Sequence, residues 1–263
     1  FSGKAIYQPT GKAAEYSPWA CNFFTGCSND CEYCYCKRGV MSHVWNTRPQ
    51  LKKCFKDEEH AYAIFKKELL DNIDALRKSG LLFSFTTDPL LPETKYLTYY
   101  AIQTATENGV PVKVLTKRSD FIEDIKFLHL ERELIAFGFT LTGCDDKEPG
   151  ASSNYERIEA MHELHKMGFK TFASIEPVIV PAMSMNMMIA TRGFCDLYKV
   201  GLISGKGKGF YNEKHLQVCY EWLEKESYSQ KIYLKDSFIT YLGIQRENLP
   251  GEFVNSDYNI FHQ

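Results

Sequence analysis

A run of closely spaced cysteines constrains this chain more than any other feature of its sequence. Cys27, Cys31 and Cys34 have the spacing C-x3-C-x2-C in a polar loop that follows a short apolar stretch. Thiolates are soft ligands, and a short loop can bring several of them around one metal centre. Three thiolates can hold three irons of a [4Fe–4S] cube, which leaves the fourth iron open to an outside ligand such as an amino-acid chelate.

A structural zinc site is the main alternative use of these thiols. Cys36 would supply a fourth thiolate, and zinc is often bound by four. The pair Cys34-x-Cys36 is cramped for a tetrahedral site, and structural zinc motifs usually combine two separated pairs. A disulfide framework fits less well, because nine cysteines are an odd number and 263 residues can build an ordinary core. A non-catalytic iron–sulfur or zinc protein is therefore the alternative class.

The composition excludes several other functions. The net charge is −2, so the chain lacks the overall positive charge typical of nucleic-acid-binding proteins. It contains no apolar run of 18 residues, which argues against a membrane span, and nothing resembling a signal peptide is visible. Free thiols and an oxygen-sensitive cluster favour a reducing compartment, so we expect a cytoplasmic protein.

Apolar periodicity predicts a regular alternation of strands and helices along most of the chain. We expect capping boxes at Asp120 with Glu123 and at Ser153 with Glu156. The predicted strands cover 20–24, 81–86, 111–115, 134–141, 170–175, 197–203 and 232–234, and the predicted helices cover 57–79, 94–108, 120–129, 153–167, 184–192 and 213–226.

Six such βα units with short connections predict an α/β fold whose parallel sheet curls into a partial (β/α)6 barrel of the TIM type. We expect one domain over residues 1–263, with 1–19 as an N-terminal arm, 20–235 as the barrel and 236–263 as an irregular C-terminal tail. Barrels of this kind carry their chemistry at the C-terminal ends of the strands. The cysteine loop falls at such an end, directly after the first strand.

Polar residues follow several of the other strands. Thr87 and Asp88 come after the second strand, where they are suited to hold an ammonium group, although an Asp-Pro pair is also a common turn. Lys117 follows the third strand and can meet a carboxylate, unless it is a solvated basic turn. Thr140 and Thr142 lie on one face of the fourth strand, where they can reach a ribose hydroxyl or simply pack.

Glu176 ends the fifth strand. A carboxylate at a barrel mouth is more often functional than one on a helix surface, but an ion pair with Lys117 or Arg157 would also account for it. These alternatives stay open from the residues alone.

The motif C-x3-C-x-Tyr-C, with Tyr33 before the last cysteine, resembles the signature of the radical S-adenosylmethionine (SAM) superfamily. Over residues 22–205 the chain is similar to the spore photoproduct lyase-like, or DNA photolyase-like, branch. The segments that carry this resemblance are Tyr33-Cys34-Tyr35, Thr86-Thr87-Asp88-Pro89, Thr116-Lys117, Glu148-Pro149-Gly150-Ala151-Ser152-Ser153 and Arg157-Ile158-Glu159-Ala160.

The resemblance implies a radical SAM core in which a [4Fe–4S] cluster binds SAM at its open iron. An electron from a donor such as flavodoxin or ferredoxin would cleave SAM to a 5′-deoxyadenosyl radical, which removes hydrogen from a substrate. The implied cluster ligands are Cys27, Cys31 and Cys34. The implied SAM contacts are Thr87 and Asp88 near the amine, Lys117 near the carboxylate and Thr140 or Thr142 near the ribose. Tyr33 and Glu176 are further candidates for binding the cofactor.

One position departs from the photoproduct lyases, where a cysteine immediately before the Thr-Ser-Asp-Pro segment returns the hydrogen. This chain has Phe85 there. Tyr33 and Tyr35 match the lyases' tyrosine pair, and Tyr35 is a candidate catalytic residue. Cys144, just beyond the fourth strand, is a candidate substitute donor or a passive small residue.

The resemblance points to a nucleic acid or nucleotide as substrate. Phe85 and the near-neutral charge argue against it. A peptide or small metabolite is the alternative.

Overall fold

Most strands of the computed structural model, which describes residues 1–38, 42–43, 45–207 and 209–261, belong to one eight-stranded sheet. Its strands stand side by side in chain order, and all neighbours are parallel except β1 and β2. They are β1 (Ile6–Tyr7), β2 (Ala20–Cys21), β5 (Leu81–Phe83), β6 (Val112–Thr116), β7 (Ile135–Thr140), β8 (Lys170–Val178), β9 (Leu197–Leu202) and β10 (Ile232–Leu234).

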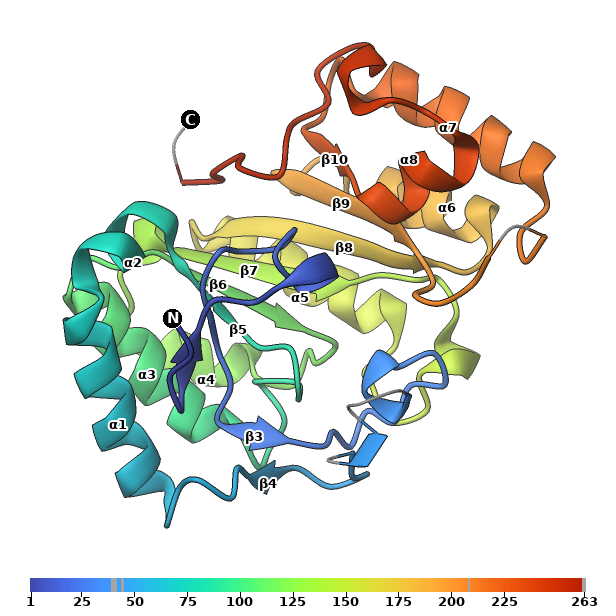
Figure 1. Ribbon diagram of the computed structural model, residues 1–263. Helices are drawn as coiled ribbons and strands as arrows, with labels where there is room; N and C mark the ends of the chain where they lie inside the picture. The colour runs from blue at the N-terminus through green and yellow to red at the C-terminus, as the bar shows by residue number, and fades with distance from the viewer. Residues whose placement is uncertain (39–41, 44, 208, 262–263) are drawn as a thin grey trace.

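The helices lie along the outer side of this curved sheet (Figure 1). Strands that follow one another without a reversal of order are typical of a (β/α) barrel and not of a doubly wound sheet. The predicted partial (β/α)6 barrel is therefore confirmed. The helices are α1 (Glu58–Asp71), α2 (Ile73–Ser79), α3 (Lys95–Glu107), α4 (Ile122–Phe127), α5 (Asn154–Lys166), α6 (Pro181–Thr191), α7 (Glu213–Glu226) and α8 (Asp236–Leu242).

A small antiparallel ribbon frames the cysteine loop. Its strands are β3 (Phe24–Thr25) and β4 (Gln50–Leu51). The predicted strand at 20–24 is thus divided, because the chain leaves the barrel sheet after Cys21 to form the ribbon. This division lets residues 26–38 fold as a loop over the end of the sheet.

One of the two expected capping boxes forms. Ser153 and Glu156 cap α5 reciprocally, as predicted. The box expected at Asp120 was wrong, because α4 begins only at Ile122 and the Asp120 carboxylate accepts instead from the Arg118 guanidinium at 3.0 and 2.7 Å. A charged partner two residues away outcompetes the backbone for this carboxylate.

The N-terminal segment is more than the expected polar arm, because it enters the barrel. The Tyr16 side chain is buried, and its backbone carbonyl accepts from Lys199 at 3.2 Å and from Lys113 at 3.4 Å. The Lys235 ammonium lies 4.4 Å from the centre of the Tyr16 ring. Burial lowers the pKa of Lys113 to about 8. The arm thus fills the interior of the open barrel.

The C-terminal tail is also more ordered than expected. It contains α8, and Ile260 is buried against Ala136, Phe172 and Leu197 at the inner face of the sheet. Among the described residues no helix is long and apolar enough to cross a membrane.

The inner face of the barrel is closely packed where β7 and β8 meet. Gly138 pairs with Phe172 across the two strands, and a Cβ atom added to Gly138 would lie 2.1 Å from the Phe172 ring. Any larger side chain must therefore displace a buried ring.

We expect Gly138→Ala to lower the free energy of unfolding by about 1–3 kcal/mol, because overpacking forces neighbouring side chains out of their rotamers. Urea denaturation measures the effect. Gly193→Ala is the matched control, since an added Cβ there meets no atom within 4 Å. Equal stability of the two variants would contradict the packing argument.

Candidate active site

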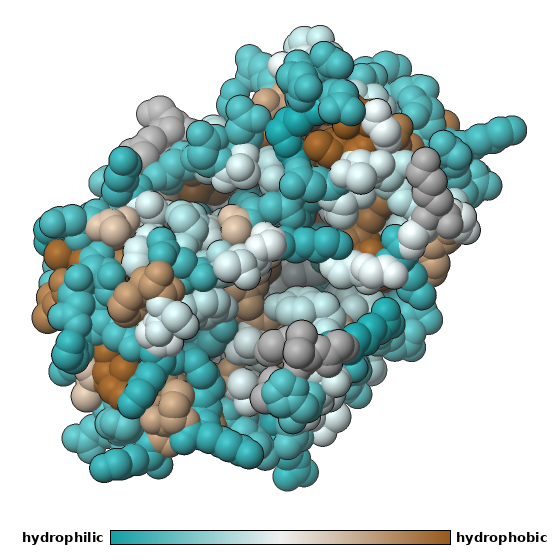
Figure 2. Space-filling view, viewed as in Figure 1, coloured by the Kyte–Doolittle hydropathy of each residue, from teal (hydrophilic) through white to brown (hydrophobic). Residues whose placement is uncertain are grey.

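A cavity of about 430 Å³ lies at the C-terminal ends of the strands, between the cysteine loop and the barrel. The surface is hollowed near the centre of the face seen in Figure 2. The loops after β5, β6 and β9 and the ends of β7 and β8 contribute to its wall. This is the position that the barrel topology predicts for a site.

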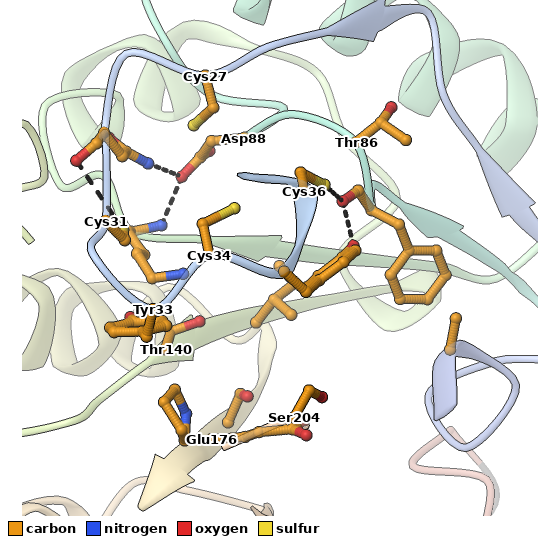
Figure 3. A pocket seen from close by; sticks show the side chains of 18 of the residues that line it. Cys27, Cys31, Tyr33, Cys34, Cys36, Thr86, Asp88, Thr140, Glu176 and Ser204 are labelled. Atoms are coloured by element: carbon orange, nitrogen blue, oxygen red, sulfur yellow. Dashed lines mark hydrogen bonds between the residues drawn. The ribbon is translucent and has the colours of Figure 1, made fainter. Parts of the chain in front are cut away.

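The thiols of Cys27, Cys31 and Cys34 line one end of this cavity, while Glu176 and Ser204 lie at the opposite end (Figure 3). All nine cysteines are free. Burial raises the pKa of Cys27 to about 12, with the Asp88 carboxylate adding to the effect. A hydrogen bond from Cys36 and the ammonium groups of Lys117 and Lys37 lower the pKa of Cys34.

Cys36 is a fourth thiol at the cavity, and its Sγ lies 3.7 Å from the Phe85 carbonyl oxygen. In the described part of the chain, no three His, Cys, Asp or Glu side chains converge where one metal ion could bind. The ligands of a cubic cluster need not converge in this way, because each thiolate binds its own iron.

The cysteine loop is held from outside by the segment that starts at Lys147. The Gly150 amide donates to the Asn29 carbonyl at 3.1 Å, and the Glu32 amide donates to the Lys147 carbonyl at 3.0 Å. A Cβ atom on Gly150 would lie 2.0 Å from the Ser28 carbonyl oxygen, so only glycine allows this approach.

Tyr33 is fixed by the same segment. Its hydroxyl donates to the buried Glu148 carboxylate, which also forms an ion pair with Arg157. Burial and the nearby Glu148 raise the pKa of Tyr33 well above its usual value, so the hydroxyl remains a donor. The Lys117 ammonium lies 5.6 Å from the centre of the Tyr33 ring. Tyr33 thus positions the last turn of the cysteine loop.

Lys117 presents a cation to the cavity. Burial opposes its charge, but Cys31 and Glu148 together raise its pKa. No ion pair to Lys117 occurs among the residues that the structure describes. The neighbouring basic residue Arg118 is instead paired with Asp120. Lys117 is therefore available to an anionic group in the cavity.

Asp88 lines the cavity, but its carboxylate is already occupied. Oδ1 accepts from the Leu90 amide at 3.0 Å and the Thr116 hydroxyl at 2.7 Å, and Oδ2 accepts from the Asn29 amide group and the Lys117 amide, both at 2.7 Å. A carboxylate has about four acceptor positions. The expected contact of Asp88 with a bound ammonium would need one of these bonds to break.

Two of the expected residues, Thr142 and Cys144, do not line the cavity. Thr140 ends β7 and faces it, but Thr142 points elsewhere: its hydroxyl donates to Glu148 at 3.2 Å and accepts from the Cys144 amide. The alternation of side chains stops with the strand, and Gly143 turns the chain with φ +72°. Cys144 follows this turn and does not line the cavity, which favours the alternative that it is a passive small residue.

Glu176 has partners that the sequence analysis missed. Its Oε2 accepts from the Tyr16 hydroxyl at 2.6 Å and from the Lys235 ammonium at 2.8 Å, not from Lys117 or Arg157. No motif marks Tyr16 or Lys235, because they come from the two ends of the barrel sequence. The second catalytic candidate, Tyr35, lines the cavity and donates to the Phe85 carbonyl.

The sequence matches the model of the Radical SAM superfamily over residues 21–195. The chain belongs to the radical SAM superfamily. A search of curated proteins also finds an uncharacterized protein of Methanocaldococcus jannaschii, which is 24% identical over 216 residues and matched over 78% of this chain and 79% of its own length.

Several solved structures share the fold. A mutant of spore photoproduct lyase aligns with a TM-score of 0.54 at 14% identity, over 88% of this chain and 58% of its own. SuiB of Streptococcus suis aligns with a TM-score of 0.54 at 11% identity, over 90% of this chain and 52% of its own. The chain thus spans little more than half the length of these two proteins. At such identities the likeness concerns the fold alone.

The cavity fits the cofactors that the superfamily implies. Three thiols surround one end, a cationic Lys117 lies beside them, and two buried polar atoms there, Asn29 Oδ1 and Thr87 Oγ1, have no partner within the described residues. Cys27, Cys31 and Cys34 would hold a [4Fe–4S] cluster, and the polar groups would hold SAM. A neighbouring lyase structure contains bound SAM.

We expect Gly150→Ala to reduce the iron bound after anaerobic reconstitution, because the added methyl group pushes the cysteine loop at Ser28. Iron and sulfide analysis measures the loss. Gly193→Ala serves again as the control, since it adds a methyl group in open space. Wild-type iron content in Gly150→Ala would contradict the role given to this contact.

Proposed function

We propose that this protein is a radical SAM enzyme that cleaves SAM reductively and removes a hydrogen atom from an organic substrate. The observation that carries the proposal is one cavity lined by three free thiols, the Lys117 ammonium and two buried polar oxygens. Among the residues that the structure describes, this ammonium makes no ion pair and these oxygens have no hydrogen-bond partner. When bound, the cluster and SAM supply one-electron cleavage of the sulfonium bond and a 5′-deoxyadenosyl radical.

The chain's own residues bind and orient these groups. Cys27, Cys31 and Cys34 provide three thiolates, and Lys117 is placed to pair with the SAM carboxylate. Thr140 lines the middle of the cavity, within reach of a ribose in the proposed arrangement. An electron donor such as flavodoxin or ferredoxin would supply the electron.

Glu176 closes the end of the cavity opposite the thiols, held by Tyr16 and Lys235. We therefore place the substrate, or the adenosyl part of SAM, against this end. Burial and the Glu176 carboxylate raise the pKa of Tyr16 well above its usual value, so its hydroxyl stays protonated and keeps Glu176 in position.

The substrate remains a matter of proposal. One lyase structure with this fold is described as holding SAM and a dinucleoside spore photoproduct, which supports a nucleic acid or nucleotide. At the sequence position where the resemblance places the lyases' returning cysteine, this chain has Phe85, which lines the cavity. The Phe85 ring packs edge-on against the Tyr16 ring, with 6.2 Å between the two ring centres. A thiol relay at this position is therefore not proposed, and a peptide or small metabolite is the alternative substrate.

The cluster assignment is tested on anaerobically reconstituted and reduced protein. We expect an EPR signal of a reduced [4Fe–4S] cluster that changes when SAM is added, together with formation of 5′-deoxyadenosine. Ala variants of Cys27, Cys31 or Cys34 should lose the signal, while Cys36→Ala should keep it. Loss in Cys36→Ala would favour a four-thiolate site, and a cluster indifferent to SAM would favour a non-catalytic protein.

Lys117→Met tests the carboxylate contact. We expect SAM to bind about ten- to a hundredfold more weakly, because a charged hydrogen bond is lost, while iron content stays unchanged. Equilibrium dialysis with labelled SAM measures the affinity. Arg118→Met is the control, since Arg118 is adjacent but paired with Asp120; equal affinities of the two variants would contradict the assignment.

A further inference from the structure

Charge is distributed unevenly along the chain beside the cysteine loop. The whole sequence has 31 basic and 33 acidic residues, yet no Asp or Glu occurs between Glu32 and Asp57. The basic residues of this acid-free segment are Lys37, Arg38, Arg48, Lys52, Lys53 and Lys56. A protein with a small net charge thus carries a strongly cationic stretch directly after the last thiol of the loop.

The second half of this segment lies against one flank of the cysteine loop. Strand β4 pairs with β3, and the Cys27 amide donates to the Asn46 carbonyl at 2.9 Å. A Cβ atom on Gly26 would lie 2.7 Å from the Asn46 and Arg48 carbonyl oxygens, so the two backbones are in close contact there. The chain from β4 to α1 runs along the edge of the molecule (Figure 1). Positive charge therefore borders the loop on its ribbon side.

Three cations of this segment are available to an outside partner. Arg48, Lys53 and Lys56 are exposed, and none of them makes an ion pair within the part of the chain that the structure describes. Lys37, by contrast, is paired with Asp30. Like charges without counter-charges repel one another, and a partner that brings carboxylates relieves this repulsion.

The position of these cations indicates what kind of partner they serve. In the proposed function an electron must reach the cluster from a second protein, which has to dock close to the thiols. SAM would fill the cavity side of the thiols, and residues 147–150 cover another flank of the loop. The ribbon is a third flank, and it presents exposed charge for docking.

A redox protein fits this surface better than a nucleic acid does. Electron-transfer partners meet over small, polar interfaces that complementary charges steer. A single-stranded nucleic acid needs exposed aromatic rings for stacking as well as cations. On this segment Phe55 is buried, and the Lys37 ammonium lies over the Trp45 ring, 5.3 Å from its centre. Carboxylates around a redox centre are therefore the matching chemistry.

We propose that Arg48, Lys53 and Lys56 form the docking surface for an acidic electron-transfer protein that reduces the cluster. One electron leaves the reduced flavin or iron–sulfur centre of the partner and takes the cluster from its oxidised to its reduced state, and no bond forms or breaks in this step. The inference rests on the proposed function and deepens it, because it names the surface through which the electron enters.

The test uses the anaerobically reconstituted protein with SAM and reduced flavodoxin, an acidic flavoprotein, as the probe. Formation of 5′-deoxyadenosine measures electron delivery, and carbodiimide cross-linking to flavodoxin measures docking directly. We expect the wild-type rate to fall as salt rises, because salt screens the steering charges. Arg48→Glu/Lys53→Glu is expected to lower the rate about tenfold or more at low salt and to lower cross-linking with it.

Two controls separate docking from damage to the loop. Lys214→Glu/Lys225→Glu changes the net charge by the same amount at exposed positions of α7, and we expect it to keep the wild-type rate. Photoreduced deazariboflavin is a small reductant that needs no docking surface. It should support the same rate in the wild type and in both double variants, with unchanged iron content.

Four results would overturn the inference. They are a wild-type rate with flavodoxin that does not respond to salt, equal slowing of the two double variants, and slowing of Arg48→Glu/Lys53→Glu by both reductants at wild-type cross-linking. The fourth is weaker binding of single-stranded DNA with unchanged cross-linking, which would assign the surface to a nucleic acid.

The outcome with deazariboflavin also separates this inference from the proposed function. A wild type that forms no 5′-deoxyadenosine with this reductant rejects the proposed function. A normal yield with deazariboflavin, together with no effect of Arg48→Glu/Lys53→Glu on the flavodoxin reaction, rejects the docking surface alone.

Discussion

The carboxylate of Asp88 joins the segments that build the cavity. It accepts from the cysteine loop through Asn29, from its own loop through Leu90, and from the end of β6 through Thr116 and Lys117. A buried carboxylate is costly unless it is fully hydrogen-bonded, so each donor is held where it is by the need to satisfy this group. The cysteine loop, the loop after β5 and the end of β6 therefore share one anchor.

A buried ion pair gives a second anchor on the opposite side of the cysteine loop. The side chains of Arg157 and Glu148 are both fully buried, and a pair of this kind adds little net stability because desolvation offsets its attraction. Its value here is orientation: Glu148 receives the Tyr33 hydroxyl, and Arg157 donates to the Thr140 carbonyl at 2.6 Å. The pair thereby connects the cysteine loop to the end of β7.

The sequence predicted the parts of this structure that depend on local patterns. Apolar periodicity located the barrel strands, and the cysteine spacing located the loop that lines the cavity with Cys27, Cys31 and Cys34. Thr142 was misplaced because period-two alternation holds only inside a strand, and β7 ends at Thr140. The bond from Asn29 to Asp88 was missed because it joins two loops 59 positions apart, which no local spacing reveals.

The residues that no pattern predicted lie at the other end of the cavity. Tyr16 comes from the N-terminal arm and Lys235 from the end of β10, and both fall outside residues 21–195, the part that matches the superfamily. Their contacts with Glu176 span 160 and 59 positions in the sequence, so only the folded barrel brings them together. The thiol end is built from the shared core and suits cofactors that members have in common. The Tyr16–Glu176–Lys235 end is built partly from segments outside that match, so its side chains do not follow from membership of the superfamily.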